Sequence, residues 1–260
     1  MAEPARVALP ALDAWLVESL RLTCFPAPDS VIEPSGWWAG VTGGEPESTT
    51  LKVKGAVQVH EGHLEQGRMR LTVQPPRIDW ELIFPAPEEP ETFTLPTIGP
   101  YPDVAGVLSK LAAKWFALAS CPRPARLAFA GTLLQPVEDR EHGYELAAKY
   151  LRDRVYIDAK GSRDLIYRIN RPRLSTSGIT GLEINRLNTW AVMVVSKIAT
   201  VSGDKARRTF PMGQAFALRL ELDVNTSAEF DGQFTQEQTP QVFQELLALG
   251  QEIAAAGDIA

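Results

Sequence analysis

Hydrophobic and polar residues alternate along three neighbouring stretches in the first third of the chain. Residues 51–60, 67–73 and 78–84 each place apolar side chains at every second position, with polar or charged side chains between them. A period of two predicts half-buried β-strands. Glu61-Gly62 and Pro75-Pro76 separate the three stretches. The pattern therefore predicts an antiparallel meander with one face toward water.

The rest of the chain combines strands with amphipathic helices. From Asp103 to Pro122 apolar residues recur at intervals of three and four, which predicts a helix with one apolar stripe. Residues 140–151 predict a second helix, and Thr239-Pro240 begins a final one. Further strands are expected at 126–134, near 164–170, at 182–195 and at 214–224. Because consecutive strands dominate, the expected fold is α+β: a largely antiparallel sheet or sheets with amphipathic helices packed on one face, in one or two lobes.

A proline-rich stretch divides the chain at residues 85–102. Proline removes a backbone hydrogen-bond donor, so this stretch is expected to be a linker or a long surface loop. The expected organisation is a strand-rich part at 1–84, the linker or loop at 85–102, and an α+β part at 103–260. One continuous domain is the alternative. The N-terminal segment ALDAWLVESLRLTCF is compatible with either a helix or a strand.

Composition narrows the class of protein. The chain is 45% hydrophobic and 22% charged, as globular proteins are. Its two cysteines lie far apart and form neither a disulfide framework nor a zinc motif. It carries no phosphate-binding loop, dinucleotide fingerprint or nucleophile elbow, so we expect no cofactor. No secretory signal is evident, and the apolar run LNTWAVMVVS is about half as long as a membrane span. We therefore expect a cytoplasmic protein that does not enter membranes.

Charge is unevenly spread along the chain. Residues 140–210 carry 14 Lys and Arg against 7 Asp and Glu, whereas the remainder carries 12 against 25. Such asymmetry is typical of a protein with one face that meets an acidic partner. The basic segment is interleaved with aromatic residues, which single-stranded nucleic acid also requires. These basic residues are the expected partner-binding set: Arg168, Arg171, Arg173, Arg186, Lys205, Arg207 and Arg208. Residues 203–210 are expected to form a charged loop between strands.

The segment HEGH contains two histidines, His60 and His63, beside glutamates. Two histidines with a third ligand are typical of zinc sites. Here, however, the segment falls at a predicted strand end and turn rather than on a helix. A polar hairpin tip in water explains it more simply, and the metal site is kept as the alternative.

Asp79 and Glu81 lie two residues apart and so share one strand face. Paired carboxylates of this kind can hold Mg²⁺ in a nuclease or act as acid and base. Alternatively, they face Arg68 and Arg70 of the neighbouring strand and form cross-strand ion pairs. The pairing interpretation is favoured, and a catalytic Asp79 and Glu81 remain the alternative.

The tripeptide Ile-Asn-Arg occurs twice, ending at Arg171 and at Arg186. Strand alternation places each isoleucine and arginine on one face and the asparagine on the other. An arginine at a strand end can extend its head into water. Two such arginines on neighbouring strands can instead frame a carboxylate from a helix or from a partner.

Residues 67–260 resemble a sporadically distributed family of uncharacterised bacterial α+β proteins of similar length. The resemblance lies in AKWFALA followed by RPARLAFAG, in the strands around INR, and in LRLELDVNTSAEF with a closing FQELLALGQEI. It implies an α+β fold and supplies no catalytic residues. It also implies an accessory component of a mobile-element or antiviral defence locus.

Three functions follow from these observations. The first is a binding or assembly protein without catalytic activity, which holds a protein partner through a sheet face or the basic segment. The second is a metal-dependent nuclease, and the third is a module that binds single-stranded nucleic acid. A homo-oligomer is compatible with all three.

Overall fold

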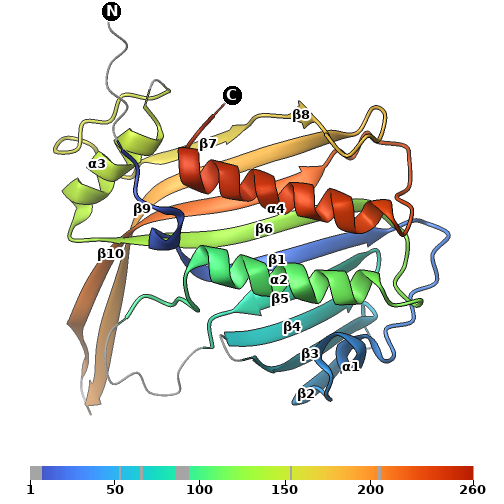
Figure 1. Ribbon diagram of the computed structural model, residues 1–260. Helices are drawn as coiled ribbons and strands as arrows, with labels where there is room; N and C mark the ends of the chain where they lie inside the picture. Colours follow the sequence, from blue (N-terminus) through green and yellow to red (C-terminus); the bar gives the residue numbers. More distant parts are fainter. Residues whose placement is uncertain are drawn as a thin grey trace, which may run out of the picture.

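The structure, a computed structural model, is built around one open antiparallel sheet of ten strands with four helices (Figure 1). It describes residues 8–259 except 53, 65–66, 86–93, 153 and 204–205, and of residues 197–212 it describes the backbone alone. The strand order is β2-β3-β4-β5-β1-β6-β10-β9-β7, and β8 also pairs with β9. The expected α+β fold, with its antiparallel sheet and helices on one face, is confirmed.

The first half of the chain builds one side of the sheet. It starts with a short 3₁₀ turn and a central strand, passes through a short helix, and returns to the centre by a four-stranded meander. A long helix then crosses the sheet. The elements are η1 (Leu12–Ala14), β1 (Leu16–Pro26), α1 (Trp37–Thr42), β2 (Ser48–Lys52), β3 (Val57–Leu64), β4 (Gly67–Gln74), β5 (Arg77–Ile83) and α2 (Tyr101–Phe116).

The second half repeats this order of elements on the other side. A central strand is followed by a helix, by strands that run from the sheet edge back toward the centre, and by a long final helix. The elements are β6 (Pro124–Val137), α3 (Arg140–Tyr150), β7 (Ile166–Asn170), β8 (Arg173–Leu174), β9 (Glu183–Gly203), β10 (Ala206–Thr226) and α4 (Gln238–Ala256). The antiparallel pair β1–β6 is the seam between the two halves.

The core lies between the sheet and the helix layer. Helices α2 and α4 lie side by side across the same sheet face (Figure 1). Their apolar stripes bury residues such as Leu108 and Phe243 against the inward side chains of the central strands. Each half also contributes tryptophans that contact other aromatic rings, Trp80 with Trp115 in the first and Trp190 with Tyr150 in the second. The opposite sheet face carries no helix of the described chain.

The strand predicted at 51–60 is wrong. The chain there forms a hairpin, in which β2 ends at Lys52 and β3 begins at Val57. Gly55 and Ala56, at the turn, both have positive φ, 90° and 48°. Apolar residues on both sides of the turn happen to occupy odd-numbered positions, so the alternation looks continuous in the sequence. Consequently Glu61-Gly62 lies within β3 instead of ending a strand.

The structure also decides the other predicted elements, some of which it confirms and one of which it corrects. The strands predicted at 67–73 and 78–84 and the helices predicted at 140–151 and from 239 are confirmed to within a few residues. The helix predicted between Asp103 and Pro122 is present, but it ends at Phe116. The ambiguous N-terminal segment is the strand β1 at the centre of the sheet. Residues 206–210, expected in a loop, belong to β10 instead. The described helices include none long and apolar enough to cross a membrane.

Candidate binding groove on the open sheet face

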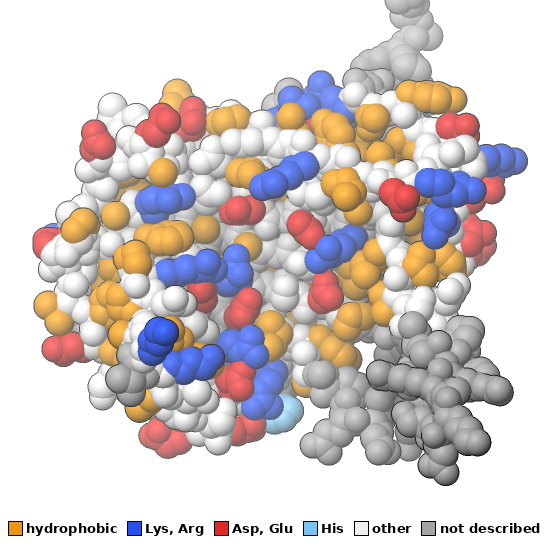
Figure 2. Space-filling model, turned by 180° about the vertical axis from the view of Figure 1, so that it is seen from behind, with side chains coloured by type: hydrophobic (Ala, Val, Ile, Leu, Met, Phe, Trp, Pro, Cys, Tyr) orange, Lys and Arg blue, Asp and Glu red, His pale blue; other side chains and the backbone are white. Residues whose placement is uncertain are grey.

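The sheet has two chemically different faces. One is covered by helices, and the other, seen from behind in Figure 2, carries basic and acidic side chains close together. Arginines and carboxylates occur there in near equal number. Among the described residues they include Arg21, Arg68, Arg70, Arg77, Arg168 and Arg219 with Glu18, Glu61, Asp79, Glu81, Glu221 and Asp223. The open face is therefore polar but close to neutral.

Charges alternate along one row that crosses the strands. Glu61, Arg70, Glu81 and Arg21 are successive neighbours in the register of β3, β4, β5 and β1. Arg70 Nε lies 2.6 Å from Glu61 Oε1, and longer contacts of 3.7 and 3.8 Å join Glu81 to Arg70 and Arg21. Cross-strand pairs of opposite charge stabilise a sheet by about 0.2–1 kcal/mol each. This charge ladder ends at Arg21, because the next residue in the row, on β6, is Ala130.

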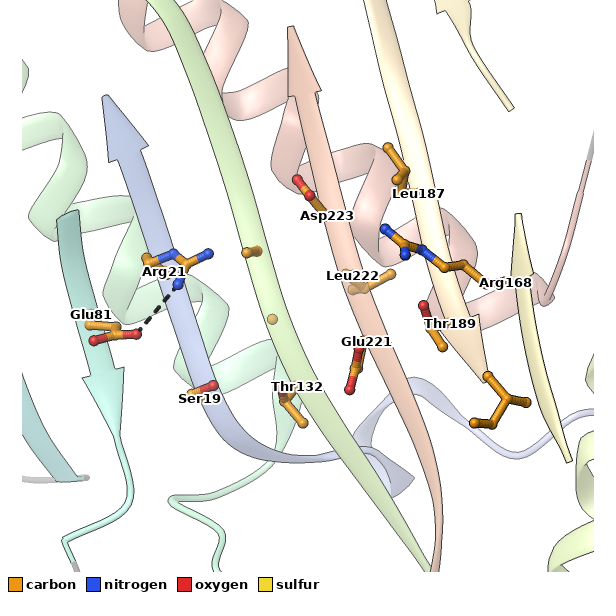
Figure 3. Close-up of a pocket in the computed structure, with 13 residues that line it drawn as sticks. Ser19, Arg21, Glu81, Thr132, Arg168, Leu187, Thr189, Glu221, Leu222 and Asp223 are labelled. Atoms are coloured by element: carbon orange, nitrogen blue, oxygen red, sulfur yellow. Dashed lines mark ion pairs between the residues drawn. The ribbon is translucent and has the colours of Figure 1, made fainter. Parts of the chain in front are cut away.

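A groove of about 470 Å³ lies where the charge ladder ends. Its floor is formed largely by small side chains of the two central strands, and longer side chains rise on β5 and on the strands from β10 outward (Figure 3). From β5 to β10 is three strand spacings, or about 14 Å. The lining residues are Ser19, Arg21, Glu81, Ala130, Gly131, Thr132, Ile166, Arg168, Leu187, Thr189, Glu221, Leu222 and Asp223.

Two arginines extend toward each other from opposite sides of the groove, with Asp223 between them (Figure 3). Arg21 comes from β1 and makes only long ion pairs, and its buried Nε has no hydrogen-bond partner within the described chain. Arg168 comes from β7 and forms no ion pair with any described residue. The Asp223 carboxylate accepts one hydrogen bond, from Asn225 Nδ2 at 2.9 Å. The groove thus contains charged groups whose hydrogen-bonding capacity is unused.

Asp79 and Glu81 both lie on the open face, as their spacing predicts. Asp79 accepts hydrogen bonds from Thr23 Oγ1 at 2.5 Å and from Arg77 Nε. Glu81 forms its ion pairs within the charge ladder. Both carboxylates therefore have arginine partners. Among the described residues there is no cluster of three or more His, Cys, Asp or Glu side chains with the arrangement of a metal site.

The two histidines of HEGH lie on opposite faces of β3. His63 pairs with Arg68 in the register of the open face, whereas His60 pairs with Leu71 on the helix side. Residues three apart in a strand point in opposite directions, so the two rings do not converge. The His60 ring packs 6.3 Å from Trp38 and lies 3.0 Å from Thr49 Oγ1. Burial lowers the pKa of His60.

The asparagines of the two INR tripeptides hydrogen-bond to one another on the open face. Asn170 Nδ2 donates to Asn185 Oδ1 at 2.9 Å, and Asn185 Nδ2 donates to Asn225 Oδ1 at 3.1 Å. Asn170 Oδ1 also accepts from the backbone N–H of Arg186. The repeated tripeptide therefore joins neighbouring strands β7, β9 and β10.

The predicted basic set has four members whose side chains are described. Three of them, Arg171, Arg173 and Arg186, lie away from the groove, on the helix side of the sheet. Arg171 makes a bidentate contact to Asp258, just beyond α4, with distances of 2.6 and 2.7 Å, and Arg173 contacts Glu252 of α4. The expectation that an INR arginine binds a carboxylate from the helix layer holds for Arg171. Arg186 is only 2% exposed, so the prediction that its guanidinium group extends into water is wrong. Burial lowers the pKa of Arg186.

The remaining members of the basic set lie outside the described residues or side chains. Lys205 falls in an undescribed gap, and Arg207 and Arg208 belong to β10 where the backbone alone is described. Of the four members of the set whose side chains are described, Arg168 is the one that lines the groove. The partner-binding role of the set stays a prediction.

Sequence reasoning missed the groove itself. Ala130, Thr132 and Ser19 matter because they are small, and a small residue in a strand is no signal until its neighbours across the sheet are known. The register supplies those neighbours.

No family model, curated protein or solved structure matches this chain.

Proposed function

We propose that this chain is a binding protein that holds a protein partner on the open face of its sheet, without catalysis. The single observation that supports the proposal most is the groove of about 470 Å³ at the seam of the two halves. Its arginines and carboxylates come from β1, β5, β7 and β10 of one continuous sheet. Rigid elements present these charged groups in a fixed pattern, and such patterns determine the partner and the register of a complex.

The charge balance of the open face favours a protein partner over nucleic acid. Neutralising phosphates requires an excess of basic groups along the surface. Here arginines such as Arg70 and Arg77 have carboxylate partners within the same face. A surface of alternating charge is complementary to another surface of alternating charge. Protein surfaces carry both signs, whereas a nucleic acid backbone carries one.

The metal-dependent nuclease stays a prediction that rests on Asp79 and Glu81. Arginine partners on both carboxylates suit structural ion pairing. Its test is cleavage of a labelled oligonucleotide with Mg²⁺. Loss of that cleavage in the Asp79→Ala, Glu81→Ala double variant would establish the nuclease and refute the proposed binding role.

Site-specific photo-cross-linking tests the binding role directly. The photo-reactive amino acid p-benzoylphenylalanine is placed at Thr189 in the groove wall and, in a matched variant, at the exposed Lys110 on helix α2. Both chains are expressed at natural levels in the source cells and irradiated. We expect one discrete cross-linked protein from Thr189 and none from Lys110. Its identity also tests whether the partner belongs to a mobile-element or defence locus.

A charge variant separates the groove from the rest of the surface. Arg168→Glu reverses a charge inside the groove, whereas Arg123→Glu reverses one in an exposed pair with Asp29 outside it. The cross-link from Thr189 should weaken in the first variant and persist in the second. Equal cross-linking from Thr189 and Lys110, or equal loss in both charge variants, would contradict the proposal.

A further inference from the structure

The alternation of charge across the open face is interrupted at one position. In the register, Glu81, Arg21, Ala130 and Asp223 are successive neighbours on β5, β1, β6 and β10. The charges of these four side chains are negative, positive, none and negative. Asp223 and Arg21 are therefore two strand spacings apart, about 10 Å between Cα atoms. Only a methyl group, that of Ala130, lies between them on this face.

We propose that this gap is the binding site of a small zwitterion, an α-amino acid, which carries its carboxylate and its ammonium on one carbon atom. The carboxylate is bound by the guanidinium group of Arg21, and Arg168 lies on the far side of Asp223. The ammonium is bound by the carboxylates of Asp223 and Glu221. The bound molecule restores the alternation of charge between Arg21 and Asp223.

The donors in the groove suit a carboxylate. Guanidinium groups present planar pairs of N–H donors that match a carboxylate in a bidentate contact. Arg21 forms only long ion pairs within the described chain, 3.7 Å to Asp79 and 3.8 Å to Glu81, so its guanidinium group lacks a close acceptor there. Arg168 forms no ion pair in the same part of the chain and extends into the groove from the opposite side (Figure 3). A ligand carboxylate supplies an acceptor for the end of the Arg21 guanidinium group that faces β6 (Figure 3), and Arg168 keeps the far side of the groove basic.

The acidic side chains of the groove disfavour a simple anion as its ligand. Glu81, Glu221 and Asp223 line the same groove as the two arginines. A phosphate dianion placed among them is repelled, because like charges within a few ångström disfavour each other. A bare cation is repelled in turn by the arginines. A molecule that carries both charges satisfies both sets of groups.

The room available also fits a small molecule. A volume of about 470 Å³ lies within the range of roughly 300–1,000 Å³ that ligand pockets occupy. The floor is Ser19, Ala130 and Thr132, which leave the backbone of the central strands close to the surface. Thr132 in the floor and Thr189 in the wall add hydroxyl groups.

Titration with matched amino acid derivatives tests the assignment, which rests on the proposed function because it takes the open face as the binding surface. The probes are L-alanine, L-lysine, L-glutamate and L-phenylalanine, each with its N-acetyl and its carboxamide counterpart. Amide chemical shifts of the full chain are followed by NMR. We expect at least one free amino acid to shift groove resonances at millimolar concentration, and both of its capped forms to bind at least tenfold more weakly.

Variants test the named groups. Arg21→Gln and Asp223→Asn should each weaken binding of that amino acid by tenfold or more, since each variant removes the charge that binds one end of the ligand. Ala130→Leu fills the gap without changing a charge and should abolish binding. Arg123→Gln, in an exposed pair outside the groove, should leave binding unchanged. Circular dichroism confirms that each variant is folded.

Three results would overturn the assignment: no free amino acid shifts a groove resonance, a capped form binds as tightly as its parent, or Arg21→Gln and Asp223→Asn bind like the wild type. Cross-linking from Thr189 is measured independently. If it succeeds while every amino acid fails, the zwitterion assignment alone is refuted. If both fail, the binding role of the open face is refuted as well.

Discussion

Asp258 is the most informative residue to change in the helix layer. Its side chain is fully buried beyond the end of α4, where it accepts hydrogen bonds from Arg171 Nε at 2.6 Å, Arg171 Nη2 at 2.7 Å and Tyr167 Oη at 2.6 Å. Arg154 Nε lies 3.7 Å away. The contact joins the C-terminal segment to β7. Asp258→Asn keeps the shape of the side chain and removes its charge.

The expected cost is about 2–3 kcal/mol at neutral pH. Breaking a fully buried ion pair by removing one partner costs roughly 3–5 kcal/mol. The Arg171 side chain is 26% exposed, so water recovers part of the loss. Asparagine also retains one acceptor for the guanidinium. The estimate therefore lies below the range for a fully buried pair.

The pH dependence gives the sign of the effect. Burial alone raises the pKa of Asp258, but the hydrogen bonds from Arg171 and Tyr167 outweigh burial and hold the pKa below its usual value. A lowered folded-state pKa stabilises the protein above the unfolded pKa, near 3.9. That stabilisation is lost as the pH falls through the folded-state pKa. The gap between wild type and Asp258→Asn should therefore be full at pH 7 and close in strong acid.

Urea unfolding followed by tryptophan fluorescence measures this difference at each pH. The control is Asp29→Asn, because Asp29 also pairs with an arginine, Arg123 at 3.1 Å, but both side chains are about 60% exposed. An exposed pair contributes about 0–1 kcal/mol. If Asp258→Asn costs no more than Asp29→Asn at pH 7, or if its cost is independent of pH, the reasoning is refuted.

Three smaller predictions concern packing, thiol chemistry and the charge ladder. Gly250→Ala should cost about 1–3 kcal/mol in thermal unfolding, because the added Cβ lies 2.6 Å from Phe129 Cε1, whereas Gly106→Ala in α2 meets nothing within 4 Å and should be neutral or stabilising. Burial raises the pKa of the Cys121 thiol to about 12, so iodoacetamide at pH 8 should alkylate it only after unfolding, and rapid alkylation of the folded chain would contradict this. Arg70→Ala should cost about 0.5–1 kcal/mol at low salt and less at about 1 M salt, where charges are screened beyond about 3 Å; a cost independent of salt would show that its ion pairs do not stabilise the sheet.

The parts of the fold that the sequence predicts are those with one wet face. Strands β4 and β5 carry polar or charged residues at nearly every second position, so their period of two is clear. Helix α2 shows the corresponding period of a helix because one stripe faces the sheet. In each case the pattern of apolar residues depends only on which side of the element faces water. Such a pattern can be recognised without knowing which strands or helices pack beside it.

Other elements escape prediction for physical reasons. The β2–β3 hairpin turns at Gly55 and Ala56, but apolar residues happen to keep the same spacing on both sides of the turn. The β1 segment places apolar residues at spacings that suit both periods, and its position between β5 and β6 decides the matter. Arg186 looks like a surface arginine in sequence, yet it is only 2% exposed. These features depend on contacts between distant segments.

The candidate groove is a still stronger case, because it exists only where the two halves of the chain meet. Its floor is the β1–β6 seam, and its walls come from β5 in the first half and from β10, β9 and β7 in the second. Within the first half, charged residues pair with one another along the ladder, and within the second, asparagines hydrogen-bond along β7, β9 and β10. Each half thus satisfies most of its own open face and leaves its unused groups, Arg21 on one side and Arg168 and Asp223 on the other, facing the seam. A ligand bound there contacts both halves at once, so its binding free energy adds to the stability of the sheet at the seam.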